Sequence, residues 1–294
     1  MIPAAPTSKV LVPPRPRWLA EVARRPSGAF GLILVVLLAV ILAIGPLVAP
    51  YPYAQQDVAH RNEGPSASHL LGTDHLGRDL LSRLLTGTRI ALGTAFPAVL
   101  SALLVGLVLG LIAGYAGGWF DNLTLILLDT VQAFPTIILM LALLALLGPS
   151  TRNVIIVIAL TFAPGYARVT RAQVLAVKEN PYIEVERSLG ASGFRIVFVH
   201  ILANVLAPLF ILLAMDLPSA IATEAGLSFL GFGVRPPTPS WGVMLSDGFS
   251  RIRISPWPVL WPSAALMLTT LGFTFFGEAL RDILDPKLAG SRRV

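Results

Sequence analysis

Few residues in this chain have the types and spacing that chemistry at a reactive site requires. None of its lysines (Lys9, Lys178 and Lys287) follows a glycine, so no Gly-Lys-Ser/Thr element is present to bind nucleotide phosphates. The patterns HExxH, GxSxG and GxGxxG are absent, and so is cysteine, which excludes disulfides and thiolate metal sites. We therefore predict no catalytic residue, no metal and no cofactor bound by this chain, which indicates that it is not an enzyme.

One polar loop gathers groups that could bind a metal, because His69 and His75 lie close in sequence to Asp74 and Asp79. Nitrogen and oxygen donors of this kind permit a metal site. A polar loop with ordinary turn residues accounts for the same composition, and we favour that interpretation.

Four acidic residues interrupt apolar stretches, where an ionised group is costly and is therefore a functional candidate: Asp129, Asp216, Glu224 and Glu278. Asp129 and Glu278 fall near the ends of their stretches, where water or an arginine such as Arg281 can solvate them. Asp216 and Glu224 fall deeper. If they face the interior of a helix bundle, they either line a translocation path or bond neighbouring helices to each other.

The elements that must position these groups are membrane spans. Hydrophobic residues make up 55% of the chain and charged residues only 13%, which is about half the charged content of a typical soluble domain. The net charge of +6 does not indicate nucleic-acid binding, because many basic residues flank apolar runs instead of forming one basic face. We predict an all-α polytopic membrane protein with six spans, at about residues 29–49, 90–116, 122–148 (interrupted by Asp129 and Pro135), 153–167, 202–230 and 258–280.

The spans also carry packing and topology signals. The first is too long for the apolar core of a signal peptide, so we interpret it as an uncleaved span. Gly106, Gly110 and Gly114 recur every four residues, so this face of the second span is expected to pack closely against protein. Six spans put both termini and the segment 168–200 on one side. That side holds about 14 of the 22 Lys and Arg residues, which predicts cytoplasmic termini.

The segment 180–200, "NPYIEVERSLGASGFRIVFVH", is charged although it lies between two spans. Asn180 is a favourable N-cap and Pro181 suits the first helical position, so a short helix is predicted to start there. Gly190 can adopt the left-handed conformation that ends such a helix, and Ser192 can cap the next one. A surface helix joined rigidly to two spans would act as a lever. An ordinary amphipathic cytoplasmic loop is the simpler alternative.

This segment resembles the "EAA" loop of ABC importer permeases, which forms a coupling helix. Glu184 and Gly190 match the motif, while Val185 and Glu186 stand at its two alanines and Ala203 stands where proline is usual. Four longer strings resemble the C-type permease of dipeptide, oligopeptide and nickel importers: "LLGTDHLGRDLLSRLLTGTRIAL" (70–92), "GGWFDNLTLILLDTVQAFP" (117–135, with Ile126 where arginine is usual), "EAGLSFLGFGVRPPTPSWGVMLSDG" (224–248) and "LRDILDPKL" (280–288).

The resemblance implies a type I ABC importer transmembrane domain. A second homologous permease would complete the path, two ATPase subunits would bind ATP and Mg in the cytoplasm, and an extracytoplasmic binding protein would deliver substrate. The ATPase-coupling residues it implies are Ile183, Glu184, Val185, Glu186, Leu189, Gly190, Ala191 and Ser192, with the apolar face of Ile183, Val185 and Leu189 filling a groove of the ATPase. The outer surface that meets the binding protein or the partner permease would include Gly231, Pro236, Pro237 and Trp241.

The expected organisation follows from the spans and the resemblance: a cytoplasmic tail (1–28), the first span (29–49), an extracytoplasmic loop (50–87), a transmembrane domain (88–282, with coupling loop 172–200) and a second cytoplasmic tail (283–294). The predicted function is a permease subunit for di- or oligopeptides in a bacterial or archaeal cell membrane. The alternatives are a permease for nickel or another small solute and a proton-driven secondary transporter that uses Asp216 and Glu224. A membrane-embedded enzyme has no supporting set of residues.

Overall fold

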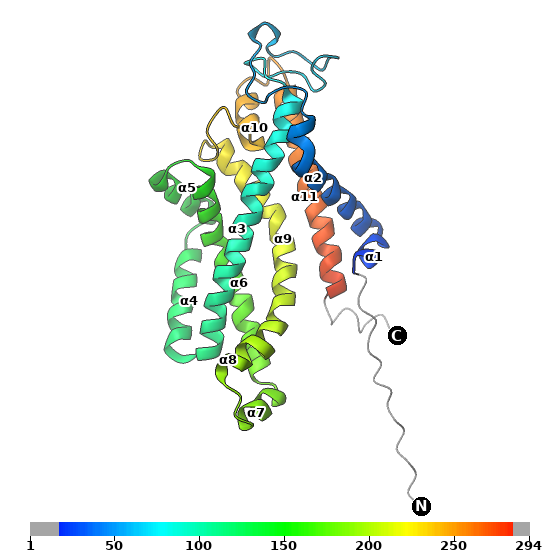
Figure 1. The fold of residues 1–294 in the computed structure, drawn as a ribbon. Coiled ribbons are helices and arrows are strands. Elements are labelled where there is room, and N and C mark those ends of the chain that lie inside the picture. The colour runs from blue at the N-terminus through cyan, green and yellow to red at the C-terminus, as the bar shows by residue number, and fades with distance from the viewer. Residues whose placement is uncertain (1–17, 285–294) are drawn as a thin grey trace, which may run out of the picture.

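A computed structural model describes residues 18–284, and the regular elements of that range are helices (Figure 1). The longer helices are α2 (Pro26–Val48), α3 (Leu80–Ala116), α6 (Thr151–Lys178), α9 (Leu202–Phe229) and α11 (Trp257–Leu284). The shorter ones are α1 (Trp18–Ala23), η1 (Val58–His60), α4 (Gly118–Gln132), α5 (Thr136–Leu147), α7 (Pro181–Ser188), α8 (Gly193–Arg195), the π-helix η2 (Ile196–Ile201) and α10 (Trp241–Phe249).

Five helical runs in the described residues are long and apolar enough to cross a membrane: α2, α3, α6, the run 193–229 and α11. A sixth crossing forms if α4 and α5 are counted together, since they are bent by 88° at a short break. Pro135 lies in that break and has no N–H to continue α4. The predicted all-α membrane fold is thus confirmed, with five to six candidate spans for the six predicted, and so is the interruption at Pro135. Asp129 does not interrupt its span, because it lies inside α4.

Three predicted helix limits were wrong. The tail predicted over 1–28 contains α1 and the start of α2, while residues 1–17 of it, and residues 285–294 of the other tail, lie outside the described residues. The second span starts at Leu80 because the Asp79 carboxylate accepts a hydrogen bond from the Ser82 N–H at 2.8 Å and caps the helix. The fourth span continues to Lys178, so the first part of the expected coupling loop 172–200 is helix α6.

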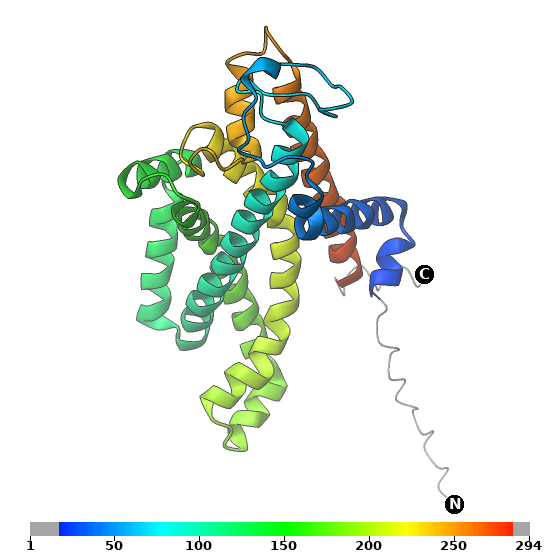
Figure 2. The same cartoon turned by 45° about the horizontal axis from the view of Figure 1, so that its top comes forward.

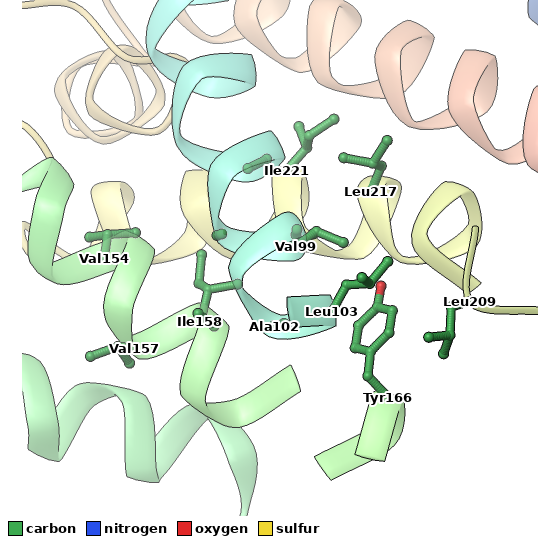
Figure 3. Close-up of a cluster of buried hydrophobic side chains, with 14 of the residues drawn as sticks. Val99, Ala102, Leu103, Val154, Val157, Ile158, Tyr166, Leu209, Leu217 and Ile221 are labelled. Atoms are coloured by element: carbon green, nitrogen blue, oxygen red, sulfur yellow. The ribbon is translucent and has the colours of Figure 1, made fainter. Parts of the chain in front are cut away.

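Helix α3 lies at the centre of the bundle and packs along α6 (Figures 1 and 2). A Cβ atom at Gly106 would lie 2.4 Å from the Tyr166 Cβ atom, and one at Gly110 would lie 2.5 Å from the Ala167 carbonyl oxygen. The predicted close approach of this glycine face to protein is therefore confirmed. Figure 3 shows the adjoining apolar core, in which side chains of α3 meet those of α6 and α9: Val99, Ala102, Leu103, Val154, Val157, Ile158, Tyr166, Leu209, Leu217 and Ile221.

The two ends of the bundle differ in structure. The loop 50–79 and α10 gather at one end, and α7 projects from the other (Figure 1). The first and last described helices, α1 and α11, pack against each other, and the Arg25 guanidinium lies 2.5 Å from the Asp282 carboxylate. Functional residues can therefore lie at either end of the bundle or along the helices between the two ends.

Candidate functional site

Helix α7 ends in the turn that its sequence predicts. Gly190 has φ +84°, its N–H bonds to the Arg187 carbonyl at 3.0 Å, and the Ala191 N–H bonds to the Glu186 carbonyl at 3.0 Å. This pair of bonds is the Schellman motif, which satisfies carbonyls at a helix C-terminus and reverses the chain. Ser192 then caps the following helix, because its Oγ accepts a hydrogen bond from the Arg195 N–H at 3.3 Å. Both predictions are confirmed.

Asn180 occupies the predicted N-cap position of α7, and its backbone has the extended conformation of an N-cap, but its side chain makes no capping bond to α7. The Asn180 Nδ2 group instead donates to the carbonyls of Ala176 at 3.0 Å and Val177 at 3.2 Å. Asn180 therefore closes the C-terminus of α6, and Pro181 alone marks the start of α7.

Helix α7 is fixed to the following helical run by one buried face. The Ile183 side chain is fully buried in the apolar core, and α7 packs against η2. The Glu186 carboxylate lies 3.5 Å from the His200 Nε2 atom, which makes an ion pair whenever the imidazole is protonated. The expectation that Ile183 fills a groove in another subunit was therefore wrong, because this side chain anchors α7 to its own chain.

The opposite face of α7 is apolar and exposed. Tyr182, Val185 and Leu189, at positions i, i+3 and i+7, have exposed fractions of 44%, 57% and 80%. We call these three residues the α7 patch. Exposed apolar side chains that cluster in this way mark surfaces for protein partners. Glu184 is also exposed on α7, and the described residues offer it no ion pair.

Two exposed aromatic residues on the helical run that follows Gly190 were not predicted. Phe194 and Phe198 are 72% and 52% exposed, and their ring centroids lie 4.2 Å apart. Their i, i+4 spacing was the available signal. Charged side chains are exposed at the same end of the molecule, among them Arg187 and Arg195.

At the other end, the four residues expected on an outer surface divide into two groups. Gly231, Pro236 and Pro237 are exposed in the loop between α9 and α10. Trp241 is 1% exposed, and its Nε1 group donates to the Leu84 carbonyl at 3.2 Å. The prediction for Trp241 was therefore wrong, because its indole fills the core against α3.

His69, Asp74 and Asp79 of the loop 50–79 belong to a network of buried polar contacts. The Asp74 carboxylate accepts from the Arg78 Nε group at 2.6 Å, and the Arg83 Nε atom lies 3.5 Å away from it. The Asp79 carboxylate that caps α3 also lies 3.0 Å from the His69 Nδ1 atom. No group of three or more potential ligands gathers in metal-binding geometry within residues 18–284. The network fastens this loop to the start of α3.

The acidic residues in the spans do not form one site. Asp216 is half-buried on α9, and Glu224 is 2% exposed and accepts from the Ser228 hydroxyl at 2.6 Å. Eight residues of one helix separate them by about 12 Å along its axis. Asp129 pairs with Arg168 at 2.6 Å, which joins α4 to α6.

These features define a class of protein: a multi-pass helical subunit that offers exposed surfaces at both ends. The chain matches two family models. One describes the binding-protein-dependent transport system inner membrane component and covers residues 106–290. The other describes the N-terminal transmembrane domain of oligopeptide transport permease C and covers residues 20–65.

Relatives and a solved structure agree with these matches. The dipeptide transport system permease protein DppC of Alkalihalophilus pseudofirmus is 42% identical over 258 residues, which cover 88% of this chain and 85% of the relative. The glutathione transport system permease protein GsiD of Pectobacterium atrosepticum is 39% identical over 98% of this chain and 95% of its own length. The fold is similar to a chain of the inward-facing MetNI methionine ABC transporter, with a TM-score of 0.54 and 19% identity over 68% of this chain and 96% of that one.

This chain belongs to the family of binding-protein-dependent transport system inner membrane components. It is a permease subunit of an ABC importer in the inner membrane and is not itself catalytic. Family membership implies ATPase and binding-protein partners. The predicted family and the predicted role as a permease subunit of an ABC importer are thereby confirmed over the alternatives of a secondary transporter and a membrane enzyme.

Proposed function

We propose that this permease carries peptides. The proposal is supported by two relatives, 42% and 39% identical, whose names specify dipeptides and glutathione. Nickel or another small solute is the competing cargo. Ligand binding by the binding protein encoded with this chain distinguishes them: a peptide ligand supports the proposal, and binding of nickel without peptide contradicts it.

The proposed assembly contains a second homologous permease, two ATPase subunits that hold ATP and Mg, and a binding protein on the outer side. The α7 patch enters a groove of one ATPase subunit, and Glu184 orients the helix there. The observation that carries this role is the division of α7 into a face buried at Ile183 and an exposed apolar face at Val185 and Leu189. A helix attached in this way transmits force to the run 193–229 as a rigid body.

The remaining assignments depend on orientation. We place both termini and the segment that follows α6, residues 179–200, in the cytoplasm, because basic residues concentrate on that side. The loop 50–79 and the exposed residues Gly231, Pro236 and Pro237 then face the binding protein or the partner permease. Asp216 and Glu224 are assigned to the translocation path.

Replacing Val185 with glutamate tests the docking surface. Burying a carboxylate in an apolar groove without a partner is expected to weaken ATPase association about tenfold or more. The measurement is the amount of ATPase subunit that copurifies with the full-length permease, together with ATP-driven uptake into proteoliposomes.

The matched control is Val58→Glu. Val58 and Val185 have nearly equal exposed fractions, 58% and 57%, but Val58 lies on η1 in the loop 50–79, away from α7. Val58→Glu is expected to retain the ATPase subunits. Equal retention by the two variants would show that α7 does not form the docking surface.

A further inference from the structure

An arginine in the first third of α3 bonds to backbone carbonyls of the neighbouring helix α2, one of which a proline leaves free. Pro46 lies within α2 and has no N–H to donate to the carbonyl four residues earlier, which belongs to Leu42. The Arg89 Nε group of α3 donates to the Leu42 carbonyl at 3.1 Å, and its Nη2 group donates to the Ala43 carbonyl at 3.1 Å. Arg89 therefore satisfies the carbonyl that the proline leaves free.

These bonds do not neutralise the charge of Arg89. Its side chain is exposed, and no acidic group among the described residues lies within ion-pair distance of it. Two of the five guanidinium N–H donors bond to α2, and the others make no hydrogen bond to the described residues. An unpaired cation near the end of a membrane span is well placed to bind an anionic group at the interface.

An apolar cavity of about 260 Å³ lies between α2, α3 and α11, and its lining includes neighbours of Arg89 in the chain but not Arg89 itself. Its lining includes Leu37 and Ile41 of α2, Leu85 and Thr88 of α3, and Ala265 and Leu268 of α11. Thr88 and Leu85 directly adjoin Arg89 on α3, and Ile41 adjoins the carbonyl that Arg89 binds. Figure 2 shows α2 running beside α3 and α11.

The cavity is open at its edge, because Leu37 and Leu268 in its lining are 51% and 43% exposed. An apolar cleft between membrane helices, with an unpaired arginine adjacent in the chain to a residue of its lining, is complementary to a lipid that has an acyl chain and an anionic phosphate. We propose that this cleft binds one anionic phospholipid, whose phosphate contacts Arg89 and whose acyl chain lies between α2 and α11. This site is independent of the cargo and of the α7 patch.

Arg89→Gln tests the site, but alone it would also leave the Leu42 carbonyl unpaired. The variant is therefore made in a Pro46→Ala background, in which the N–H of residue 46 can bond to the Leu42 carbonyl within α2. The full-length chain is purified with the subunits that accompany it, delipidated, and placed in nanodiscs of phosphatidylglycerol mixed with phosphatidylcholine. Native mass spectrometry then counts the lipids that each variant retains.

Pro46→Ala alone is expected to retain phosphatidylglycerol preferentially. Adding Arg89→Gln is expected to lower this retention about fivefold, and phosphatidylcholine retention is expected to stay unchanged. Ala265→Leu, which fills the cleft without changing a charge, is expected to lower retention of both lipids. Arg152→Gln is the control, because Arg152 is an exposed arginine at the start of α6 and does not line the cleft.

Equal phosphatidylglycerol retention with and without Arg89→Gln would overturn the proposal. Cysteines introduced at Leu37 and Leu268 give a second readout. Cross-links from these positions to a partner permease, with no labelling by a photoreactive phospholipid, would show that protein occupies the cleft and would also overturn it.

Discussion

Replacing Gly110 with valine is expected to prevent α3 and α6 from packing and to reduce the folded permease recovered from membranes to a small fraction of the parent amount. A Cβ atom at this position would lie 2.5 Å from both the Ala167 carbonyl oxygen and the Thr170 Cβ atom. The first of these contacts is to backbone, so one helix must move away from the other. Overpacking of this kind costs about 1–3 kcal/mol or more, and membrane helices have little hydrophobic driving force between them to offset it.

The control for this prediction lies on the same helix. Gly93→Val adds the same side chain to α3, but a Cβ atom at Gly93 meets nothing within 4 Å. Both variants lose the same backbone flexibility in the unfolded chain, so a difference between them reports packing alone. The measurements are the yield of monodisperse protein in detergent and its thermal unfolding midpoint. If Gly110→Val matches Gly93→Val in both, the α3–α6 contact is not what holds the bundle together.

The sequence predicted this contact because the signal is local. Three glycines at a spacing of four residues place a smooth stripe on one helix face, whatever the partner is. The full length of α6 was not predictable in the same way. Arg168 and Arg171 interrupt its apolar run, and the residues that pair with them, Asp129 and Asp121, lie on α4. In the sequence, each of these arginines suggests the end of a membrane helix, because the aspartate that neutralises it is 39 or 50 positions away.

The residues of the candidate site differ in the same way: roles that depend on nearby residues could be predicted, and roles that depend on distant ones could not. Gly190 and Ser192 act on residues within five positions, so their roles were readable from the sequence. Ile183 and Trp241 were assigned to surfaces and proved to be core, because the elements that cover them come from elsewhere. Trp241, for example, bonds to Leu84, 157 positions earlier.

The role of the Asn180 side chain could not be predicted from the sequence for a different reason. Its amide can cap the helix that follows or close the helix that precedes it, and the local sequence permits both. In the folded protein its side chain takes the second role, with Nδ2 bonded to two carbonyls at the end of α6.

Replacing Gly190 with valine is expected to uncouple ATP hydrolysis from transport, with ATP-driven uptake falling about tenfold or more. Gly190 has φ +84°, a conformation that costs a residue with a Cβ about 1–2 kcal/mol and a β-branched residue most of all. A Cβ atom there meets nothing within 4 Å, so the effect comes from backbone conformation and not from a clash. If the turn relaxes, α7 changes direction relative to the run 193–229, and the α7 patch no longer moves with that run. Gly190→Asn is expected to retain most uptake, because asparagine tolerates the left-handed conformation.

Gly148→Val separates this mechanical effect from a general loss of stability. Gly148 also has φ +84° and open space around its Cβ position, but it joins α5 to α6 and lies far from α7. Because Gly148 has ψ 160°, a backbone region that is essentially restricted to glycine, Gly148→Val is expected to lose at least as much thermal stability in detergent as Gly190→Val. Only Gly190→Val should lose uptake per mole of reconstituted importer, while its ATPase subunits either dissociate or hydrolyse ATP without transport. Uptake by Gly190→Val equal to that of Gly148→Val would mean that the turn at Gly190 is a structural detail of the loop, and that force enters the membrane domain elsewhere.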